Sequence, residues 1–475
     1  MHLPEVIPVK PKMVRPNFVL VICCLSMLLV GMDVTIVNVA LPSIQHDLHA
    51  GLSGLQWIVD AYTLVVASLL MLSGSMSDRF GRRRVFQIGL VLFISGSLLC
   101  SIAHSVGQLI AFRAAQGLGA SMLNPVALAI IANTFHEPKA RAKAIGFFGA
   151  VAGLSFALGP LLGGALTQTV GWRSIFWINL PIGLAAVVLA ARFVPESKAP
   201  QARAFDPVGQ ILVFIGLASL IYAVIEGPRT GWGSPLIVSL FAVVGTVLVI
   251  FLLYEPRQRQ PFLDLRFFRS MPFSSAVILA VCAYGCFGGF LFLNALYLQQ
   301  AKGFTPFDTG LSTLPLAIMV IFFAPLSGRL VGRHGTRPSI LAAGLGILIS
   351  TLLLTGLSAT TSILLLLLSY TLFGFSLGMI NPAITNSAVA GMPLSQSGVA
   401  AAVTSASRQV GTALGVAVAG TIVHVSRAKG KNFPQATHAI WWMMAACGVV
   451  FLILGCVADT PWTRASENSS FRNSD

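Results

Sequence analysis

The stretch Gly74-Ser-Met-Ser-Asp78-Arg79-Phe-Gly81-Arg82-Arg83 joins two long apolar runs. A related stretch, Gly328-Arg-Leu-Val-Gly332-Arg333-His-Gly335-Thr336-Arg337, follows another apolar run 254 residues later. The pair Asn124-Pro125 also returns, as Asn381-Pro382, at an offset of 257 residues. Two repeats with similar offsets indicate two related halves. Parallel halves of membrane-spanning helices are a transporter architecture, with the substrate site between them.

The chain around these repeats is strongly apolar. Of its 475 residues, 56% are hydrophobic and 9% are charged, and the mean hydropathy is +0.84. A soluble domain carries about 25% charged residues, and a helix crosses the hydrocarbon core with about 20 apolar residues. We therefore expect an all-α polytopic membrane protein with fourteen spans. They lie at about 18–41, 54–77, 84–104, 108–132, 141–168, 172–193, 207–226, 235–254, 273–299, 306–332, 337–357, 361–386, 396–423 and 438–458.

The basic residues predict the orientation of these spans. With the N-terminus in the cytoplasm, 22 of the 30 Lys and Arg residues lie in cytoplasmic segments and six lie outside. Cytoplasmic loops are enriched in Lys and Arg, so we expect both termini in the cytoplasm, although the outer cluster Arg427–Lys431 opposes the trend. This bias also accounts for the net charge of +15, and no nucleic-acid partner is expected.

The repeats predict three parts of the chain. An N-terminal six-helix bundle covers 1–204, an inserted helix pair covers 205–258, and a C-terminal six-helix bundle with a cytoplasmic tail covers 259–475.

Three ionisable residues interrupt the spans of the first half. At 1.5 Å per residue, Asp33, Asp60 and Arg113 lie about 12, 9 and 8 Å below the outer ends of their spans, in one layer. An ionisable group inside the bilayer is costly and is a functional candidate. Burial disfavours a charged carboxylate and a nearby arginine favours it, so this layer can exchange a proton for a substrate. The alternative is a structural Asp–Arg pair. Arg408 has no visible acidic partner, and packing against backbone carbonyls is its alternative.

Two segments have the composition of moving parts. The fifth span is rich in small residues, which let helices approach closely, and its proline predicts a kink; they are Gly146, Gly149, Gly153, Gly159, Pro160, Gly163 and Gly164. The Gly74–Arg83 loop carries Asp78, whose carboxylate is expected at a helix N-terminus or beside an arginine. Tight packing and snorkelling basic side chains are the simpler interpretations.

Other patterns exclude further classes of protein. Gly374-Phe-Ser376-Leu-Gly378 matches a nucleophile elbow but lies in an apolar helix, and His46 and His49 lack the rest of a zinc motif. The seven cysteines lie within apolar runs, and no phosphate-binding loop is present. Asn468-Ser-Ser470 fits a glycosylation acceptor but falls in the predicted cytoplasmic tail. We expect no enzyme activity, no cofactor and no metal site.

Together these motifs resemble the major facilitator superfamily, in its branch of fourteen-helix drug:proton antiporters. The Gly74–Arg83 loop resembles the signature after helix 2, and Arg113-Ala-Ala-Gln116-Gly117-Leu-Gly119 resembles the helix 4 motif. Gly146 to Gly164 resembles the antiporter motif, with Ser155 where glycine is usual. Three further stretches resemble this branch: Asp33-Val-Thr35-Ile-Val-Asn38-Val-Ala-Leu41-Pro42, Leu55-Gln56-Trp57-Ile-Val-Asp60-Ala-Tyr62, and Trp172-Arg173 with Phe176-Trp-Ile-Asn179-Leu-Pro181-Ile-Gly183.

The resemblance implies proton-coupled export, with Asp33 as proton site, Arg113 as its tuning partner and Asp60 at an acidic position of multidrug members. Two departures matter. Gly332 replaces the acid of the second loop, and helices 10 and 13 lack the extra carboxylates of some members, which argues against divalent cations. The resemblance also implies that helices 1, 4, 9 and 12 line the cavity. The substrate-binding candidates there are Asn38, Asn124, Tyr284, Phe290, Asn294 and Asn381, with packing as the alternative for Tyr284 and Phe290.

We therefore expect drug:proton antiport of lipophilic, monocationic or neutral small molecules by alternating access. The protein is expected to act as a monomer in a bacterial inner membrane, with substrate, protons and lipid as partners. The alternatives are an exporter or symporter of one metabolite or lipid-like molecule, a membrane-embedded enzyme, and a receptor.

Overall fold

The structure is a computed structural model that describes residues 16–198, 206–258, 263–390, 392 and 394–458. These residues form helices and no strand. The helices of the first half and the insert are α1 (Pro16–Leu48), α2 (Leu52–Phe80), α3 (Arg82–Ser101), α4 (Val106–Thr134), α5 (Pro138–Thr169), α6 (Ser174–Trp177), α7 (Asn179–Phe193), α8 (Pro207–Thr230) and α9 (Pro235–Tyr254). They are followed by α10 (Met271–Leu296), α11 (Pro306–Ser312), α12 (Leu314–His334), α13 (Arg337–Leu354), α14 (Ile363–Val389), α15 (Leu394–Ala428) and α16 (Phe433–Val457), with short helical turns η1 (Glu255–Arg257), η2 (Leu265–Arg269) and η3 (Tyr297–Ala301).

Fourteen helical segments in the described chain are long and apolar enough to cross a membrane, which confirms the expected number of spans. Each coincides with one predicted apolar run. α6 and α7 together form the sixth span, and α11 and α12 form the tenth. The last span begins at Phe433 because the side chain of Asn432 accepts a hydrogen bond from Gln435 N and caps the helix.

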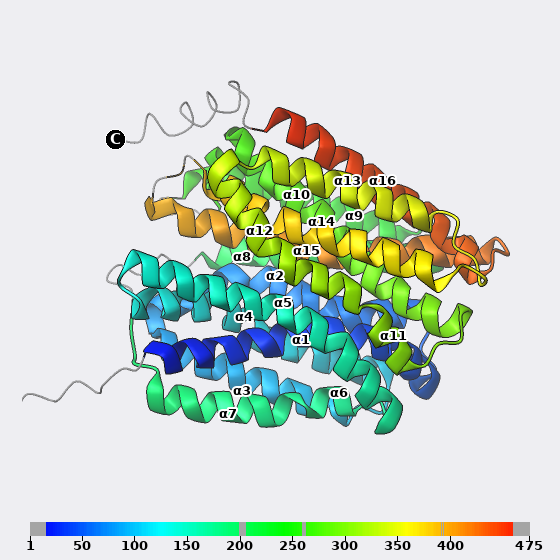
Figure 1. The fold of residues 1–475 in the computed structure, drawn as a ribbon, viewed down its shortest axis with the longest axis horizontal. Helices are drawn as coiled ribbons and strands as arrows, with labels where there is room; N and C mark the ends of the chain where they lie inside the picture. The colour runs from blue at the N-terminus through cyan, green and yellow to red at the C-terminus, as the bar shows by residue number, and fades with distance from the viewer. Residues whose placement is uncertain (1–15, 199–205, 259–262, 391, 393, 459–475) are drawn as a thin grey trace, which may run out of the picture.

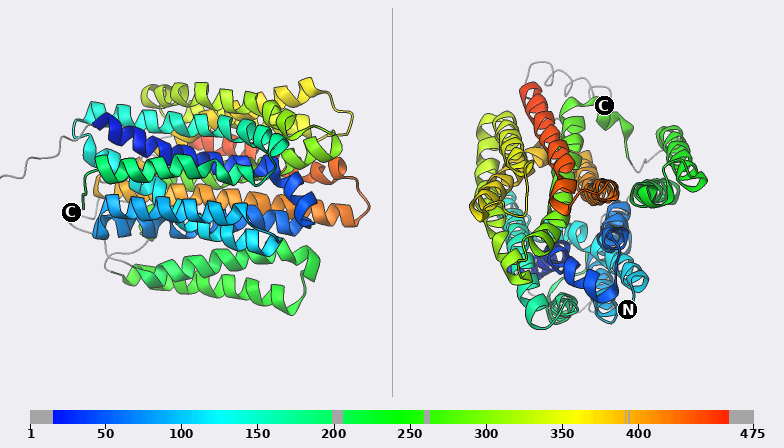
Figure 2. Two further views of the ribbon diagram at one scale, coloured as in Figure 1. Left: turned by 90° about the horizontal axis from the view of Figure 1, so that it is seen from below. Right: turned by 90° about the vertical axis from the view of Figure 1, so that its right-hand side faces the viewer.

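The same helix packing occurs twice in the chain. α2 and α3 both pack on α4, as α12 and α13 both pack on α14, and α1 packs on α5 as α10 packs on α15. The two groups lie side by side with their helices nearly parallel (Figures 1 and 2). The boundaries predicted after residues 204 and 258 touch segments 199–205 and 259–262, which lie outside the described residues.

The inserted helices α8 and α9 form a hairpin beside the two groups, and Figure 2 shows it at the edge of the bundle. Only α8 has extensive contacts with the rest, on α2 and α15. The Trp57 indole on α2 donates to Glu226 on α8 at 3.0 Å, and Thr421 on α15 donates to the Val224 carbonyl at 2.6 Å. The inserted pair is therefore held by both halves.

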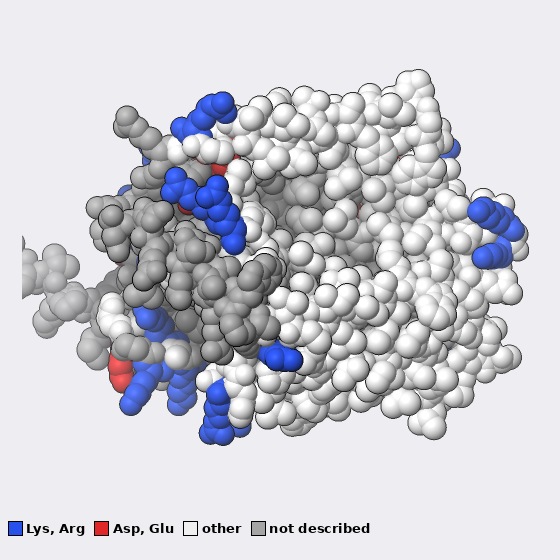
Figure 3. Space-filling model, turned by 90° about the horizontal axis from the view of Figure 1, so that it is seen from above, with Lys and Arg blue, Asp and Glu red and all other residues white. Residues whose placement is uncertain are grey.

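The two ends of the bundle differ in charge, and hydrogen bonds join the two halves near one of them. Lys and Arg gather mainly at one end, at the left in Figure 3, where α1 begins and α16 ends (Figure 1); we call it the basic end and the other the far end. Hydrogen bonds join the halves towards the far end: Gln56 to the Ala417 carbonyl at 2.8 Å, and Gln299 to the Val39 carbonyl at 2.8 Å. These bonds hold the two halves together at the far end.

Candidate functional site

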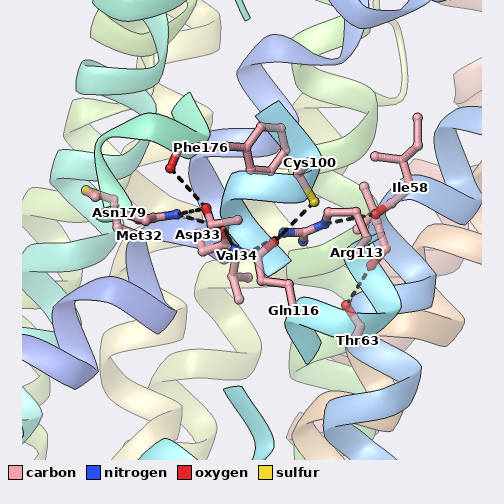
Figure 4. Close-up of polar contacts among 12 residues, drawn as sticks. Met32, Asp33, Val34, Ile58, Thr63, Cys100, Arg113, Gln116, Phe176 and Asn179 are labelled. Atoms are coloured by element: carbon pink, nitrogen blue, oxygen red, sulfur yellow. Dashed lines mark hydrogen bonds and ion pairs between the residues drawn. The ribbon is translucent and has the colours of Figure 1, made fainter. Parts of the chain in front are cut away.

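Asp33 and Arg113 form an ion pair inside the bundle (Figure 4). Nη1 of Arg113 on α4 lies 2.6 Å from Oδ2 of Asp33 on α1, and the two residues are 1% and 0% exposed. Nε of the same guanidinium donates to the Ile58 carbonyl at 3.2 Å, and its carbon lies 4.2 Å from the Tyr62 ring centroid. The structure thus brings together two residues expected in one layer.

Two neutral residues complete the surroundings of Asp33, and the sequence analysis gave neither a role beyond its motif. Nε2 of Gln116 donates to Oδ1 of Asp33 at 2.8 Å, while Oε1 of Gln116 accepts from Arg113 at 2.7 Å. Nδ2 of Asn179 on α7 donates to Asp33 at 3.4 Å and to Ser97 at 3.0 Å. Gln116 is three residues from Arg113, one helical turn away, and this spacing is the signal that could have identified it.

Asp60 lies at a similar depth but on another face of α2. A helix turns about 100° per residue, so Asp60 is about 200° from Ile58, whose carbonyl binds Arg113. It shares its side with Gln56 and Leu64, which contact α15. Asp60 is 0% exposed, and neither carboxylate oxygen has a hydrogen-bond partner. The expected three-residue layer is therefore a pair plus a separate, unpartnered carboxyl group.

A small cavity lies between the two halves beside the ion pair. Its volume of about 10 Å³ has room for no more than one water molecule. Asn38 and Arg113 line it from the first half, and Gly288 and Thr412 line it from α10 and α15. Nδ2 of Asn38 donates to the Val34 carbonyl at 2.9 Å, while its Oδ1 is unpartnered. The Oδ1 of Asn124, on α4, is also buried without a partner.

The candidates of the second half separate into two groups. The Tyr284 hydroxyl on α10 donates to Oδ1 of Asn381 on α14 at 2.9 Å, and both side chains are half-buried. Phe290 instead packs inside the C-terminal helices, with ring centroids 4.6 Å from Phe373 and 5.2 Å from Tyr370. Asn294 is buried there too and accepts from the Tyr370 hydroxyl. For Phe290 the structure thus matches the packing alternative.

The turn between α2 and α3 contains a network of charges at the basic end. Asp78 pairs with Arg82 at 3.1 Å, as one of the two sequence expectations had it. A residue that sequence reasoning missed, Glu196, accepts from the backbone N–H groups of Arg83 and Arg84 at 3.1 and 3.3 Å at the start of α3. Gly81 has a φ of +109°, and a β-carbon there would collide with Glu196. The Arg79 guanidinium lies 5.9 Å from the Phe80 ring centroid, and Gly74 has open space beside it.

The glycines of α5 divide by what they touch. β-carbons at Gly159 and Gly163 would lie 3.0 Å from carbonyl oxygens of α1, and one at Gly164 would collide with the backbone of Pro306. The carbonyl of Pro160 in turn faces Gly310 of α11. Gly146 has open space around it. Close contact between helices therefore occurs in the part of the motif nearer the far end, from Gly159 to Gly164, where α5 packs on both α1 and α11.

Comparisons with known proteins agree with the resemblance to the major facilitator superfamily. The Major Facilitator Superfamily matches residues 23–416 and 318–469. The multidrug resistance protein Stp of Mycobacterium tuberculosis is 40% identical over 84% of this chain and 74% of its own length. The tetracenomycin C resistance and export protein of Streptomyces glaucescens is 35% identical over 89% and 78%. The methylenomycin A resistance protein of Bacillus subtilis is 33% identical over 92% and 91%.

Among solved structures, the human organic anion transporter MFSD10 (TETRAN) has the same fold, with a TM-score of 0.64 and 17% identity over 93% of this chain and 99% of that one. Together with the fourteen spans and the family match over most of its length, these likenesses show that the chain is a multi-pass membrane transporter that belongs to the Major Facilitator Superfamily.

Proposed function

We propose that this chain is a proton-coupled exporter of lipophilic small molecules that works by alternating access. The observation that carries the proposal is the fully buried ion pair between Asp33 and Arg113 inside the membrane-spanning bundle. The printed names of its relatives, which describe multidrug resistance, antibiotic resistance and export, support the direction of transport and the class of substrate.

Asp33 is the proposed site at which a proton acts on the structure. In the described state its two oxygens accept from Arg113, Gln116 and Asn179. A proton on Asp33 removes the negative charge that balances Arg113, and a buried charge without its partner is strongly destabilising. Protonation therefore favours a second arrangement of α1 and α4, in which the guanidinium finds water or another acceptor.

Asp60 is proposed as a second proton site. An ionised carboxylate that is buried without a hydrogen bond costs far more than a neutral carboxyl group. Both oxygens of Asp60 are in that situation, so we propose that Asp60 carries a proton in this state. In proton-driven export this proton is taken up from the outside, and it is released once water reaches Asp60 from the cytoplasmic side.

The turn between α2 and α3 is proposed as a conformational switch. Asp78, Arg82 and Glu196 tie the end of α2 to the start of α3 and to the segment after α7. These groups are partly exposed, so the contacts are weak individually. They can bias one state over another without locking the protein.

The proposed location is the cytoplasmic membrane of a bacterium, with the basic end in the cytoplasm, in keeping with the positive-inside rule. The far end then faces outwards, and the contacts of Gln56 and Gln299 close the substrate path on that side. We therefore propose that the structure is an inward-facing state.

Transport into inverted vesicles tests the proposal. Vesicles with an acid interior are expected to accumulate a lipophilic dye with the wild-type protein, and not with Asp33→Asn. The matched control is Asp47→Asn, because Asp47 also binds an arginine at 2.7 Å but lies half-exposed at the far end. Unchanged proton-driven accumulation by Asp33→Asn would refute the assignment of the proton site. Equal loss in Asp47→Asn would point to a general effect of removing a carboxylate.

A further inference from the structure

Arg408 is a half-buried cation in the middle of a membrane span. It lies fourteen residues from the start of α15, about 21 Å along the helix, which is mid-bilayer depth. Its Nη2 donates to Oγ1 of Thr385 on α14 at 2.7 Å, and its guanidinium carbon lies 5.7 Å from the Tyr284 ring centroid. Its Nε is buried without a hydrogen-bond partner. Among the described residues no carboxylate forms an ion pair with it.

The guanidinium faces the space between the two halves. Thr412, one turn further along α15, and Gly288, one turn beyond Tyr284 on α10, both line the small cavity next to Arg113. Residues four apart share a helix face, so Arg408 and Tyr284 continue this lining by one turn towards the basic end. Thr385 is exposed. Arg408 and Tyr284 therefore lie one helical turn closer to the basic end than the cavity does. The hydrogen bonds of Gln56 and Gln299 lie on the other side, towards the far end.

An aromatic surface adjoins the cation. Phe287 lies 6.2 Å from Tyr284 and 5.3 Å from Phe156, measured between ring centroids. Phe156 belongs to α5, so this surface extends from the second half of the molecule to the first. Phe287 is buried between the other two rings, so a flat apolar molecule can lie against the half-buried rings of Tyr284 and Phe156, with one polar group directed at Arg408.

The charges around the cavity favour a negative ligand. A guanidinium has five N–H donors. Within the described part of the chain, the guanidinium of Arg408 has a single hydrogen-bond acceptor, Oγ1 of Thr385. Carboxylates are the acceptors that match its planar fork. Asp33 and Asp60, the two acidic residues that the sequence placed inside the membrane in the first half, are not available to a cation. Asp33 is fully engaged by its donors, and Asp60 is fully buried on the face of α2 that points away from Arg113.

We propose that Arg408, oriented by Thr385 and Tyr284, binds the acid group of an aromatic organic anion, which is the class of molecule that this protein exports. The inference rests on the proposed export function and replaces the monocationic or neutral substrate expected from the sequence. Asn381, which accepts from the Tyr284 hydroxyl, positions the ring under the guanidinium.

Equilibrium binding to the purified full-length protein tests the inference without a proton gradient. The probes are fluorescein, an anion, and tetramethylrosamine, a cation with the same three-ring framework. The wild type is expected to bind fluorescein more tightly, by fluorescence anisotropy. Arg408→Gln is expected to weaken fluorescein binding by about 10- to 100-fold, the range for a lost hydrogen bond to a charged group, and to leave tetramethylrosamine binding unweakened.

Two further variants keep the test valid if Arg408→Gln does not fold. Arg408→Lys retains the charge without the planar fork and is expected to keep part of the affinity for fluorescein. Thr385→Val removes only the hydroxyl that orients the guanidinium and is expected to give a smaller loss. Tighter binding of tetramethylrosamine than of fluorescein, binding of neither dye, or equal weakening of both by the variants would overturn the inference.

Transport in proteoliposomes separates this inference from the proposed function. Fluorescein binding that depends on Arg408, without transport driven by a pH gradient, would reject proton coupling and keep the substrate class. Proton-driven transport of tetramethylrosamine alone would reject the substrate class and keep proton coupling.

Discussion

Arg113→Leu is expected to leave the Asp33 carboxylate buried without its cationic partner. Removing one member of a buried ion pair costs about 3–5 kcal/mol. Gln116 and Asn179 still donate to Asp33, and each hydrogen bond to a charged group offsets part of that cost. We therefore expect a loss of about 3 kcal/mol in the free energy of unfolding, at the low end of this range.

The double variant Asp33→Asn/Arg113→Leu leaves no unbalanced charge. Replacing both members of a buried pair by neutral groups is often close to neutral, so its loss is expected to stay below about 1.5 kcal/mol, mainly from the lost contacts with Ile58 and Tyr62. Those contacts disappear in both variants. The difference between the two variants therefore measures the cost of the uncompensated charge.

Unfolding in mixed micelles, followed by tryptophan fluorescence, gives these free energies. The matched control is Arg173→Leu, which breaks a pair of about the same length, 2.7 Å, between side chains that are 33% and 47% exposed. An exposed pair contributes about 0–1 kcal/mol, so a small effect is expected there. A double variant as unstable as Arg113→Leu would refute the reasoning, because the loss would then come from packing and not from charge.

Two further predictions concern contacts between helices. Gly31→Ala places a methyl group against the Ser155 side chain and is expected to cost about 1–3 kcal/mol; adding Ser155→Gly should restore the thermal midpoint, and a failure to restore it would show that the contact is not the cause. Trp57→Phe removes the indole donor of Glu226, which is 8% exposed, and is expected to cost about 1–3 kcal/mol. Glu226→Gln, which keeps an acceptor for the indole, should cost less in the same thermal assay, and an equal loss would contradict this account.

Most of the fold could be predicted from local composition. A span needs about 20 apolar residues wherever it lies in the chain, and in lipid a helix satisfies all backbone hydrogen bonds within its own segment. Each apolar run can therefore be assigned as a transmembrane helix without knowledge of the other runs. The helix ends in the structure differ by a few residues from the predicted ends of the apolar runs. Capping residues such as Asn432 and extensions such as Gln45 to Leu48 on α1 are not part of the apolar pattern.

The candidate site could be predicted only in part. Asp33 and Arg113 were recognisable because a charge inside a bilayer is costly enough to require a partner. Glu196 and Glu226 were missed, because a carboxylate near the end of a span carries no such signal. Their roles became visible only when the chain brought them to the start of α3 and to Trp57.

The sequence by itself determined how many times this chain crosses the membrane, which of its residues are costly there, and which family it resembles, because those properties depend on local composition and motif. The tertiary structure alone decided which way each side chain points. The rotation of each helix about its axis decided that Asp60 points away from Arg113, that Phe290 is buried among the C-terminal helices, and that Arg408 points into the space between the halves. Rotation about a helix axis is set by packing against distant segments, and an apolar run of uniform composition carries too little periodicity to predict it.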